Sequence, residues 1–469
     1  MRENDSKKND ITGDNRGNER TVETMPIIKP RTLSGFLELL PEQQVKFERM
    51  LQTLRGTFAA FGFTPMDTPI IEAADILLAK GGGETEKQIY RLQKGDADLA
   101  LRFDLTVPLA KYAAQHCAEL CFPFRRYQIG KVYRGERAQR GRFREFYQAD
   151  IDIVGDGGLS IADEAEIPAV IYHAFTALGL RRFQIRLNNR KLLAGFFELL
   201  GLGERAAGAM RSIDKRDKLG TEKVRELLLA DGVSSQAADA ILSLAPDTLE
   251  RYAGKNALFD AGLSELRAVM RLLPEFGVPE THFVLDLSVA RGLDYYTGTV
   301  YETVMTAFPE VGSICSGGRY DDLAGYYIDR KLPGVGMSIG LTRLFSILQE
   351  QGLLSDEGVS APCDALILPM GADSLPAAGR VAALLRGRGV RTALHCEDKK
   401  FKAKLAYADK LKIPFVVILG EDELRDGVVS LKNMETSRQS ALPAQAAAEQ
   451  ILSELARRNS GTVIKERDI

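Results

Sequence analysis

The residue pattern changes at residues 355–362, and this change constrains the fold more than any other feature of the chain. Beyond it, short apolar runs alternate with segments of helical length. The runs at 365–368, 391–395, 415–419 and 428–431 predict strands, and the segments at 377–388, 400–411 and 444–456 predict helices. Such alternation predicts a compact α/β domain with a mostly parallel sheet over residues 363–469.

Residues 25–355 follow a different pattern and predict a larger domain. Apolar residues recur every three to four positions over 41–62, which predicts a helix with Pro41 in its first turn and Gly62 just past its end. Strand-like runs separated by charged turns follow at 99–155. Residues 190–275 are rich in Ala, Leu, Glu and Lys and poor in strand formers, which predicts a helical insertion.

The first 24 residues are polar and carry both signs of charge, so we expect a disordered tail over residues 1–24. Translation starting at Met25, which precedes the first organised segment, is a hypothesis that the mass of the native N-terminus would test. The tail lacks the apolar core of a secretory signal, and its acidic residues argue against a mitochondrial transit peptide. No apolar run approaches the roughly 20 residues of a membrane helix, so we expect a cytoplasmic protein without a membrane partner.

The composition excludes several classes of protein. The 469 residues carry a net charge of −2, so nucleic-acid binding would have to come from local patches. The five cysteines are scattered and odd in number, which argues against a disulfide framework. No cysteine pair has the spacing of a zinc knuckle and only four histidines are present, so we expect no metal held by the protein alone.

Residues 125–144 carry eight basic side chains against one acid, Glu136. The alternating tract at 127–133 predicts a strand that leads into a charged loop, and residues 143–153 predict the returning strand. One interpretation is a solvated basic hairpin, although solvated faces usually mix the two signs. The other is a polyanion site, because arginine forks match phosphate oxygens and a loop can close over them.

A short segment at 101–106 (Leu-Arg-Phe-Asp-Leu-Thr) combines charged and apolar residues. If it is a strand, the alternation places Arg102, Asp104 and Thr106 on one face of a sheet. A strand on the protein surface explains the same residues equally well, so this segment indicates a functional site only in combination with other segments.

Three further segments combine polar residues with glycines. Residues 289–298 (Val-Ala-Arg-Gly-Leu-Asp-Tyr-Tyr-Thr-Gly) suit either a strand with a bulge or a tyrosine-lined pocket with a cation at its rim. Residues 316–321 (Ser-Gly-Gly-Arg-Tyr-Asp) predict a glycine-softened turn. At 336–343, Arg343 follows two glycines, which allow a ligand to approach the backbone.

Together these segments resemble the histidyl-tRNA synthetase family, over nearly all of the chain from about residue 30. The class II signatures appear in order: a helix and strand ending at Pro69, Tyr-Arg-Gly-Glu at 133–136 with Phe-Arg-Glu-Phe at 143–146, and Gly-Leu-Thr-Arg at 340–343. The Arg-Gly-Leu-Asp-Tyr-Tyr segment at 291–296 narrows the resemblance to histidine. The resemblance implies an α+β fold, in which helices flank a class II antiparallel sheet, with a helical insertion and a C-terminal α/β anticodon-binding domain.

The function that this resemblance implies is that of a histidine–tRNA ligase. Such an enzyme activates L-histidine with ATP and Mg²⁺, releases pyrophosphate and transfers histidine to the 3′ end of tRNA(His). The first signature implies a homodimer. Six lysines and one acid at 399–412 fit contact with the anticodon stem, although a solvated helix is the simpler interpretation.

The resemblance also implies roles for four residues at the nucleotide. Arg134 would hold the α-phosphate of ATP, Glu136 would accept from the adenine amino group, and Arg343 would clamp the γ-phosphate. Arg291 would stabilise the charge that develops at the α-phosphate during attack. The substrate carboxylate is itself the nucleophile, so no enzymic base is needed and catalysis is positioning plus charge stabilisation.

The histidine pocket that the resemblance implies is built from hydrogen-bonding groups. Asp104, Thr106 and Gln148 would receive the α-ammonium group. A neutral imidazole has one donor and one acceptor, so Asp152 would accept from its N–H and Tyr296 would meet the other nitrogen. The remaining residues that the resemblance places at the pocket are Leu105, Arg134, Arg291, Tyr295 and Tyr320.

Two alternatives differ from this function. One is a non-catalytic, histidine-binding regulatory paralogue of the kind that serves ATP phosphoribosyltransferase, which lacks the anticodon domain. The other is a class II synthetase for threonine, proline or glycine, whose C-terminal domain is of the same type. The chain also departs from many bacterial members, since Asp104 replaces glutamate and Ala138 replaces proline, which leaves recognition of the acceptor end open.

Overall fold

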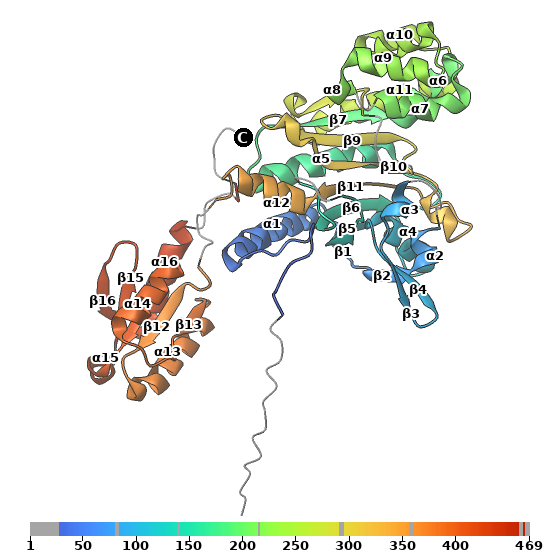
Figure 1. The fold of residues 1–469 in the computed structure, drawn as a ribbon. Helices are drawn as coiled ribbons and strands as arrows, with labels where there is room; N and C mark the ends of the chain where they lie inside the picture. Colours follow the sequence, from blue (N-terminus) through green and yellow to red (C-terminus); the bar gives the residue numbers. More distant parts are fainter. Residues whose placement is uncertain are drawn as a thin grey trace, which may run out of the picture. The chain divides into compact units, whose positions relative to one another are not determined.

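An eight-stranded sheet organises the larger part of the chain (Figure 1). Neighbouring strands are antiparallel except at the two edges, where β1 pairs with β5 and β8 pairs with β7 in parallel. In spatial order the strands are β1 (Thr64–Pro65), β5 (Phe124–Tyr133), β6 (Glu145–Val154), β11 (Gly334–Gly340), β10 (Ser313–Tyr320), β9 (Thr299–Met305), β7 (Phe183–Asn189) and β8 (Phe283–Leu285). This sheet confirms the predicted α+β class.

The computed structural model describes residues 28–79, 84–137, 141–213, 216–289, 295–355, 361–458 and 463–464. The tail predicted for residues 1–24, the hypothetical start at Met25 and the predicted catalytic residue Arg291 therefore lie outside the described residues. Residues 34–469 form one unit by their internal contacts, and residues 1–33 form another. No helix in the described part of the chain is both long and apolar enough to cross a membrane.

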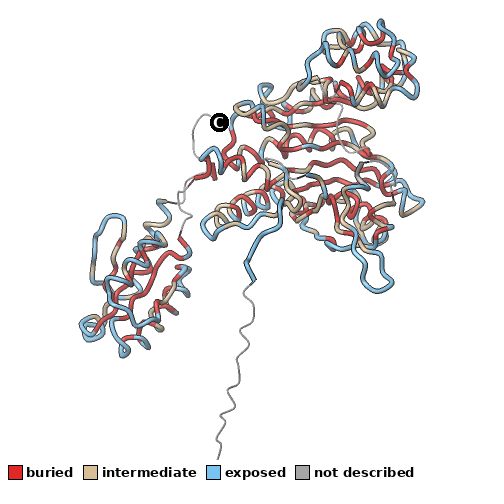
Figure 2. Tube along the Cα trace, in the orientation of Figure 1, coloured by how far each residue is buried: buried red, intermediate tan, exposed pale blue. Residues whose placement is uncertain are grey.

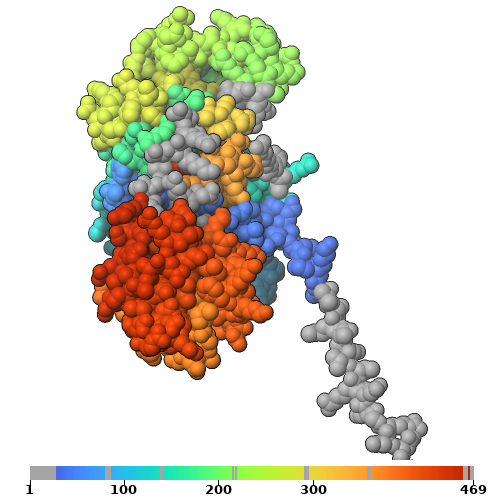
Figure 3. Space-filling view, turned by 90° about the vertical axis from the view of Figure 1, so that its left-hand side faces the viewer, coloured from blue at the N-terminus to red at the C-terminus, as the bar shows by residue number. Residues whose placement is uncertain are grey.

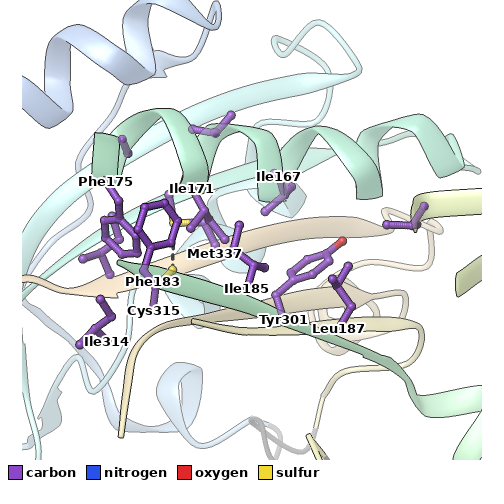
Figure 4. Packing of buried hydrophobic residues seen from close by; sticks show 14 of the residues in the cluster. Ile167, Ile171, Phe175, Phe183, Ile185, Leu187, Tyr301, Ile314, Cys315 and Met337 are labelled. Carbon is purple, nitrogen blue, oxygen red and sulfur yellow. Dashed lines mark hydrogen bonds between the residues drawn. The ribbon is translucent and has the colours of Figure 1, made fainter. Parts of the chain in front are cut away.

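Helices cover one face of the large sheet and form the main core with it (Figures 1 and 2). They are α1 (Pro41–Ala60), α5 (Ile161–Leu178), α11 (Ala257–Glu275) and α12 (Leu341–Glu350). The side chain of Ser160 caps α5 by accepting from the Ala162 N–H at 3.2 Å, and Gly179 ends it in the left-handed conformation. Ile167, Ile171 and Phe175 of α5 then meet the apolar side chains of β7, as Figure 4 shows.

The opposite face of the large sheet carries smaller elements. They are α2 (Ala74–Leu77), α3 (Glu84–Gln88), α4 (Thr106–Gln115) and a three-stranded sheet of β2 (Ile71–Ala73), β4 (Ala97–Leu101) and β3 (Arg91–Lys94). The prediction that Arg102, Asp104 and Thr106 share one strand face is wrong, because β4 ends at Leu101. Asp104 instead accepts from the Val107 N–H at 3.0 Å in the first turn of α4, and Arg102 donates to the Lys131 carbonyl at 2.9 Å.

The helical insertion predicted for residues 190–275 is confirmed. It joins β7 to β8 and consists of α6 (Arg190–Leu199), α7 (Ala206–Ile213), α8 (Arg216–Leu219), α9 (Thr221–Ala230), α10 (Ser235–Leu242) and α11. Asn189 caps α6 and Asn256 caps α11 through their side-chain oxygens. Gly195 and Gly262 let α6 and α11 approach closely, because an added Cβ would come within 2.3 Å of a backbone nitrogen on the facing helix.

The C-terminal part holds a second sheet, of five strands, with helices packed on it. Its elements are β12 (Ala365–Pro369), α13 (Leu375–Gly387), β13 (Thr392–Leu394), α14 (Phe401–Lys410), β14 (Phe415–Leu419), α15 (Glu421–Asp426), β15 (Val429–Asn433), β16 (Gln439–Leu442) and α16 (Ala444–Arg458). The prediction of a mostly parallel sheet is wrong: β13, β12 and β14 are parallel, but β15 and β16 are antiparallel. The segment around α15 is too short for a crossover, so β15 turns back beside β14.

The lysine-rich segment at 399–412 forms α14 and its flanks, in the part drawn orange to red in Figure 3. Lys400, Lys402 and Lys410 are exposed, as predicted. Lys404 is not, because its side chain is buried and its Nζ donates to the Pro369 carbonyl at 2.7 Å. The cationic surface of this helix is therefore smaller than the sequence suggests.

Candidate active site

The side chains of strand β6 alternate between the main core and a polar face of the sheet. Ala149, Ile151 and Ile153 point into the main core, and the alternate residues point to the opposite face. Each of those alternate residues is paired with one residue of β5 and one of β11. Arg126 and Gly336 flank Asp152, Gln128 and Ser338 flank Asp150, and Gly130 and Gly340 flank Gln148. On the polar face, each of these ladder rows thus places residues of β5, β6 and β11 side by side.

A small cavity of about 110 Å³ opens on this polar face. It is lined by Asp104, Thr106, Arg134, Gln148, Asp152, Tyr295, Tyr296, Ser316, Tyr320, Gly336, Met337 and Ser338. Eight of the residues that the resemblance assigned to a histidine pocket therefore line one space. Leu105 does not line it, since its side chain is fully buried and its carbonyl accepts from Arg126.

Buried carboxylates dominate the electrostatics of the small cavity. Burial raises the pKa of Asp152 to about 6, against the opposing effects of Arg126 and of a hydrogen bond from Tyr320. The Tyr320 hydroxyl donates to Asp152 Oδ1 at 2.8 Å, and Arg126 lies 2.6 Å from Oδ2. Burial also raises the pKa of Asp104 to about 6, opposed first by the Val107 N–H. Such a site suits a ligand that brings N–H donors and positive charge.

A larger cavity of about 380 Å³ adjoins the small one. The two cavities share the side chains of Arg134, Gln148, Ser316 and Ser338, so a ligand in one cavity can reach a ligand in the other. The remaining walls are Gln88, Glu136, Gly141, Arg142, Phe143, Phe146, Ser313, Ile314, Cys315, Gly340 and Arg343. The predicted nucleotide residues Arg134, Glu136 and Arg343 thus lie in one cavity.

The arginines of the larger cavity have weak protein partners. Arg134 donates to the Phe103 carbonyl at 3.1 Å and lies over the ring of Phe146. Arg343, in the first turn of α12, donates to the Val311 carbonyl, and burial lowers its pKa. Arg142 meets Glu136 at 3.4 Å. Guanidinium groups with so few anionic neighbours are suited to phosphate oxygens.

The basic run at 125–144 is only partly the polyanion site that its charge predicts. Arg125 pairs with Glu166 at 2.6 Å, Arg126 with Asp152, and Lys131 with Glu145 at 2.8 Å. All three lie on β5, whose alternation sends them to both faces of the sheet. The residues of this run that line the larger cavity, Arg134 and Arg142, lie instead just after β5 and in the loop beyond it.

Residues 316–320 form part of strand β10, so the turn predicted for residues 316–321 is wrong. The glycines serve close strand packing: a Cβ on Gly317 would lie 2.2 Å from the Gly336 carbonyl, and one on Gly318 would lie 2.9 Å from the Tyr296 ring. A regular hydrogen-bonded strand therefore occupies the segment for which the glycines predicted a turn. Glycine letters alone do not distinguish the two structures.

Several lining residues were not predicted. Ser316 and Ser338 face each other across β10 and β11 and lie between the cavities. The Gln148 amide donates to Ser338 Oγ at 2.5 Å. Asp150 is buried behind this wall, and burial raises its pKa to about 7. The even spacing of Gln148, Asp150 and Asp152 was the available signal, because one strand face must carry all three.

Comparison with known proteins assigns most of the chain to one family. The family model for histidyl-tRNA synthetase matches residues 35–344, and the model for the anticodon binding domain matches residues 364–454. The histidine–tRNA ligase of Clostridium tetani is 51% identical over 430 residues, which cover 90% of this chain and 98% of that protein.

Two solved structures share the fold. Histidyl-tRNA synthetase from Nostoc sp. PCC 7120 matches with a TM-score of 0.83 and 38% identity, over 91% of this chain and all of that one. An ATP phosphoribosyltransferase regulatory subunit/histidyl-tRNA synthetase from Bacillus halodurans matches with a TM-score of 0.68 over 81% of this chain and 97% of that one. Its 20% identity shows a common fold and nothing further.

Proposed function

The chain belongs to the histidyl-tRNA synthetase family, and on that premise we propose how its two cavities divide one reaction. It is an aminoacyl-tRNA ligase that activates histidine with ATP and passes the histidyl group to tRNA. The regulatory alternative is not supported, since residues 364–454 match the anticodon-binding domain that such a paralogue lacks. The observation that carries the division of labour is that the cavities meet at Arg134 and Gln148.

The small cavity takes the amino acid. Asp104, Thr106 and Gln148 receive the α-ammonium group, which needs acceptors. Asp152 accepts from one imidazole nitrogen and Tyr296 meets the other, while Tyr295 and Tyr320 complete the surroundings. The raised pKa of buried Asp152 supports this role, because a ligand donor compensates a carboxylate that burial makes costly.

The larger cavity takes ATP. Arg134 holds the α-phosphate beside the histidine carboxylate, Glu136 accepts from the adenine amino group, and Arg343 holds the γ-phosphate. The carboxylate oxygen attacks the α-phosphorus as the bond to pyrophosphate breaks, which gives histidyl-adenylate. The 3′ hydroxyl of tRNA(His) then attacks the carbonyl carbon, and AMP leaves. Positioning and charge stabilisation carry both steps.

Mg²⁺ enters with ATP as part of the substrate. It prefers oxygen ligands and retains several waters, so it needs few groups from the protein. Among the described residues no three His, Cys, Asp or Glu side chains cluster as a metal site. Glu302 is close enough to Arg343 to counteract the fall in its pKa, and its carboxylate is a candidate for contact with the hydrated ion.

Arg291 is the catalytic residue that the family resemblance adds. It lies outside the described residues, so this role rests on the Arg-Gly-Leu-Asp-Tyr-Tyr segment alone. A cation there would stabilise charge on the α-phosphate as the new bond forms.

The proposal extends to the whole protein. We divide it into a tail at 1–24, a catalytic domain at 25–355 and an anticodon-binding domain at 363–469, whose exposed lysines on α14 contact tRNA(His). A homodimer in the cytoplasm is the expected form. The exposed apolar side chains of Ile70 and Ile71, just after the first class II signature, support a subunit interface there.

Amino-acid-dependent exchange of pyrophosphate into ATP tests the function. Exchange is expected with histidine and not with threonine, proline or glycine. Arg291→Ala is expected to lower the histidine-dependent rate by roughly 10²–10³, the scale for losing one transition-state partner. Exchange with none of these amino acids would contradict ligase activity, and a normal rate in the variant would contradict only the role of Arg291.

A further inference from the structure

A fully buried arginine lies behind the wall of the small cavity. Arg126 is opposite Asp152 in the β5–β6 ladder, and its side chain has no exposed surface. Its Nη2 contacts Asp152 Oδ2 at 2.6 Å and donates to the Leu105 carbonyl at 3.3 Å. Arg126 lines neither cavity, so any effect on a ligand must pass through a neighbour.

The surroundings of Arg126 are poor for stabilising a fold. Its Nε and Nη1 are buried and have no hydrogen-bond partner among the described residues. Removing a guanidinium from water is costly, and an ion pair offsets this cost only when the remaining donors are also satisfied. An apolar residue of similar size would often serve the core as well, which points to a role in the site.

The charges around Arg126 indicate what that role is. Asp104, Asp150 and Asp152 are all buried beside it, and Arg126 counteracts the effect of burial on the pKa of each. The other groups that face Asp152 are the hydroxyls of Tyr295, Tyr296 and Tyr320. Arg134 lines the same cavity, but its Nε is engaged by the Phe103 carbonyl. Arg126 is therefore the cation that all three carboxylates share behind the wall.

The contacts of Asp152 fix its orientation as well as its charge. Arg126 holds Oδ2 and Tyr320 holds Oδ1, so the carboxylate cannot rotate freely. Each oxygen retains a further lone pair for a ligand. Gly336 keeps the neighbouring position free of a side chain, since a Cβ there would lie 2.1 Å from Oδ1.

We propose that Arg126 is a positioning residue for histidine recognition, which keeps Asp152 ionised and oriented to accept the imidazole N–H. This rests on the proposed role of Asp152. Without the cation, three carboxylates would share a buried space, and Asp152 would take up a proton at higher pH. Protonated Asp152 loses the charge that strengthens its hydrogen bond to the imidazole.

The test compares Arg126→Met, Arg126→Lys and Asp152→Asn in pyrophosphate exchange. Arg126→Met is expected to raise the KM for histidine roughly 10–100-fold, the scale for weakening a hydrogen bond to a charged group. The KM for ATP should change less than about threefold, and Arg126→Lys should lie between wild type and Arg126→Met. The matched control is Arg125→Met, one residue away but paired with Glu166, which should leave both values unchanged.

A pH profile separates this role from a structural one. The substrate imidazole titrates identically for every variant, so the ratio of kcat/KM for histidine in Arg126→Met to that in wild type isolates the enzyme group. The pKa of Asp152 is about 6 in the wild type and higher without Arg126, so the ratio should rise from pH 6 to 8 and then level. A flat ratio, or equal increases in both KM values, would overturn the proposal.

The variants also distinguish two kinds of failure. If Asp152→Asn binds histidine normally, the proposed role of Asp152 is wrong. If it weakens histidine and Arg126→Met does not, only the role of Arg126 is wrong. Should Arg126→Met fail to fold, Arg126→Lys decides: a KM for histidine raised severalfold, with ATP unaffected, supports the proposal, and an unchanged KM overturns it.

Discussion

The two adjoining cavities solve opposite problems of recognition. The small cavity is walled by buried groups: Asp104, Asp152 and Tyr320 are 1%, 3% and 3% exposed. The larger cavity is more than three times the volume, and Arg142 on its rim is 44% exposed in its side chain. The same strands supply both, since β6 and β11 contribute to each.

This difference teaches where discrimination arises. A buried carboxylate must find a partner in the protein or the ligand, so a wrong ligand carries the full cost of desolvation. Arginines near water stay solvated when no ligand is bound. They therefore add to the affinity for an anionic ligand without discriminating strongly between ligands. We therefore expect substitutions in the small cavity to act on histidine alone and to act strongly, and those in the larger cavity to act on ATP in proportion to burial.

The largest effect should come from Asp152→Asn. It removes the charged acceptor and leaves Arg126 without its buried anion, and breaking such a pair costs about 3–5 kcal/mol. Part of that cost appears in binding, so kcat/KM for histidine in pyrophosphate exchange should fall by roughly 10²–10³. The KM for ATP should stay within about threefold of wild type, since Asp152 lines the small cavity and not the larger one.

The control for this variant is Asp156→Asn. Asp156 follows β6 and pairs with Arg330 at 2.5 Å, but its side chain is 40% exposed. Exposed pairs contribute little, so both KM values should be unchanged. Comparable losses in the two variants, or equal losses for histidine and ATP in Asp152→Asn, would break the contrast between the cavities.

Arg343→Gln should give the next largest effect. This side chain is partly buried in the first turn of α12, and burial lowers its pKa, so a phosphate contact would be strengthened there. The KM for ATP should rise roughly 10–100-fold, with the KM for histidine nearly constant. Kinetics at saturating histidine measure the first value, and an increase in the KM for histidine alone would contradict the assignment of the larger cavity to ATP.

The stability cost of the small cavity can be measured at Asp150. Burial raises its pKa from 3.8 to about 7, so the folded chain holds a proton that the unfolded chain releases, and stability falls as pH rises between these values. Asp150→Asn should therefore raise Tm at pH 8 by about 2–4 °C, the shift that ~1 kcal/mol gives in a domain of ordinary size. The gain should be lost by pH 5, and a gain independent of pH would contradict this account.

The sequence predicted which residues of one strand lie at the cavities better than it predicted which residues of different strands face each other there. Strand alternation correctly places Gln148 and Asp152 on one face, but no periodicity says that Arg126, which belongs to the basic run, faces Asp152 rather than phosphate. That depends on register between β5 and β6. Ser316 and Ser338 were missed for the same reason, because their separation across β10 and β11 is a property of pairing.

The fold itself was predictable where local signals are strong. Helix α1 begins at Pro41 and is followed by Gly62 in the left-handed region, as the sequence indicates. The antiparallel end of the C-terminal sheet was not predictable in this way. Strands β15 and β16 are short, and their direction follows from the length of the α15 connection. Local sequence signals thus predict the helices and strands, whereas the site depends on how the strands pair.

The smallest effect should come from Arg142→Gln, on the exposed rim of the larger cavity. Its ion pair with Glu136 is long, at 3.4 Å, and both ends meet solvent, so the pair contributes less than about 1 kcal/mol. The KM for ATP should rise no more than about fivefold, and less still at high salt, where screening already weakens the contact. Arg343→Gln in the same titration is the control, because a partly buried contact is screened less. A loss in Arg142→Gln as large as that in Arg343→Gln would mean that the rim closes over ATP and excludes water, and the two cavities would then differ in size and not in kind.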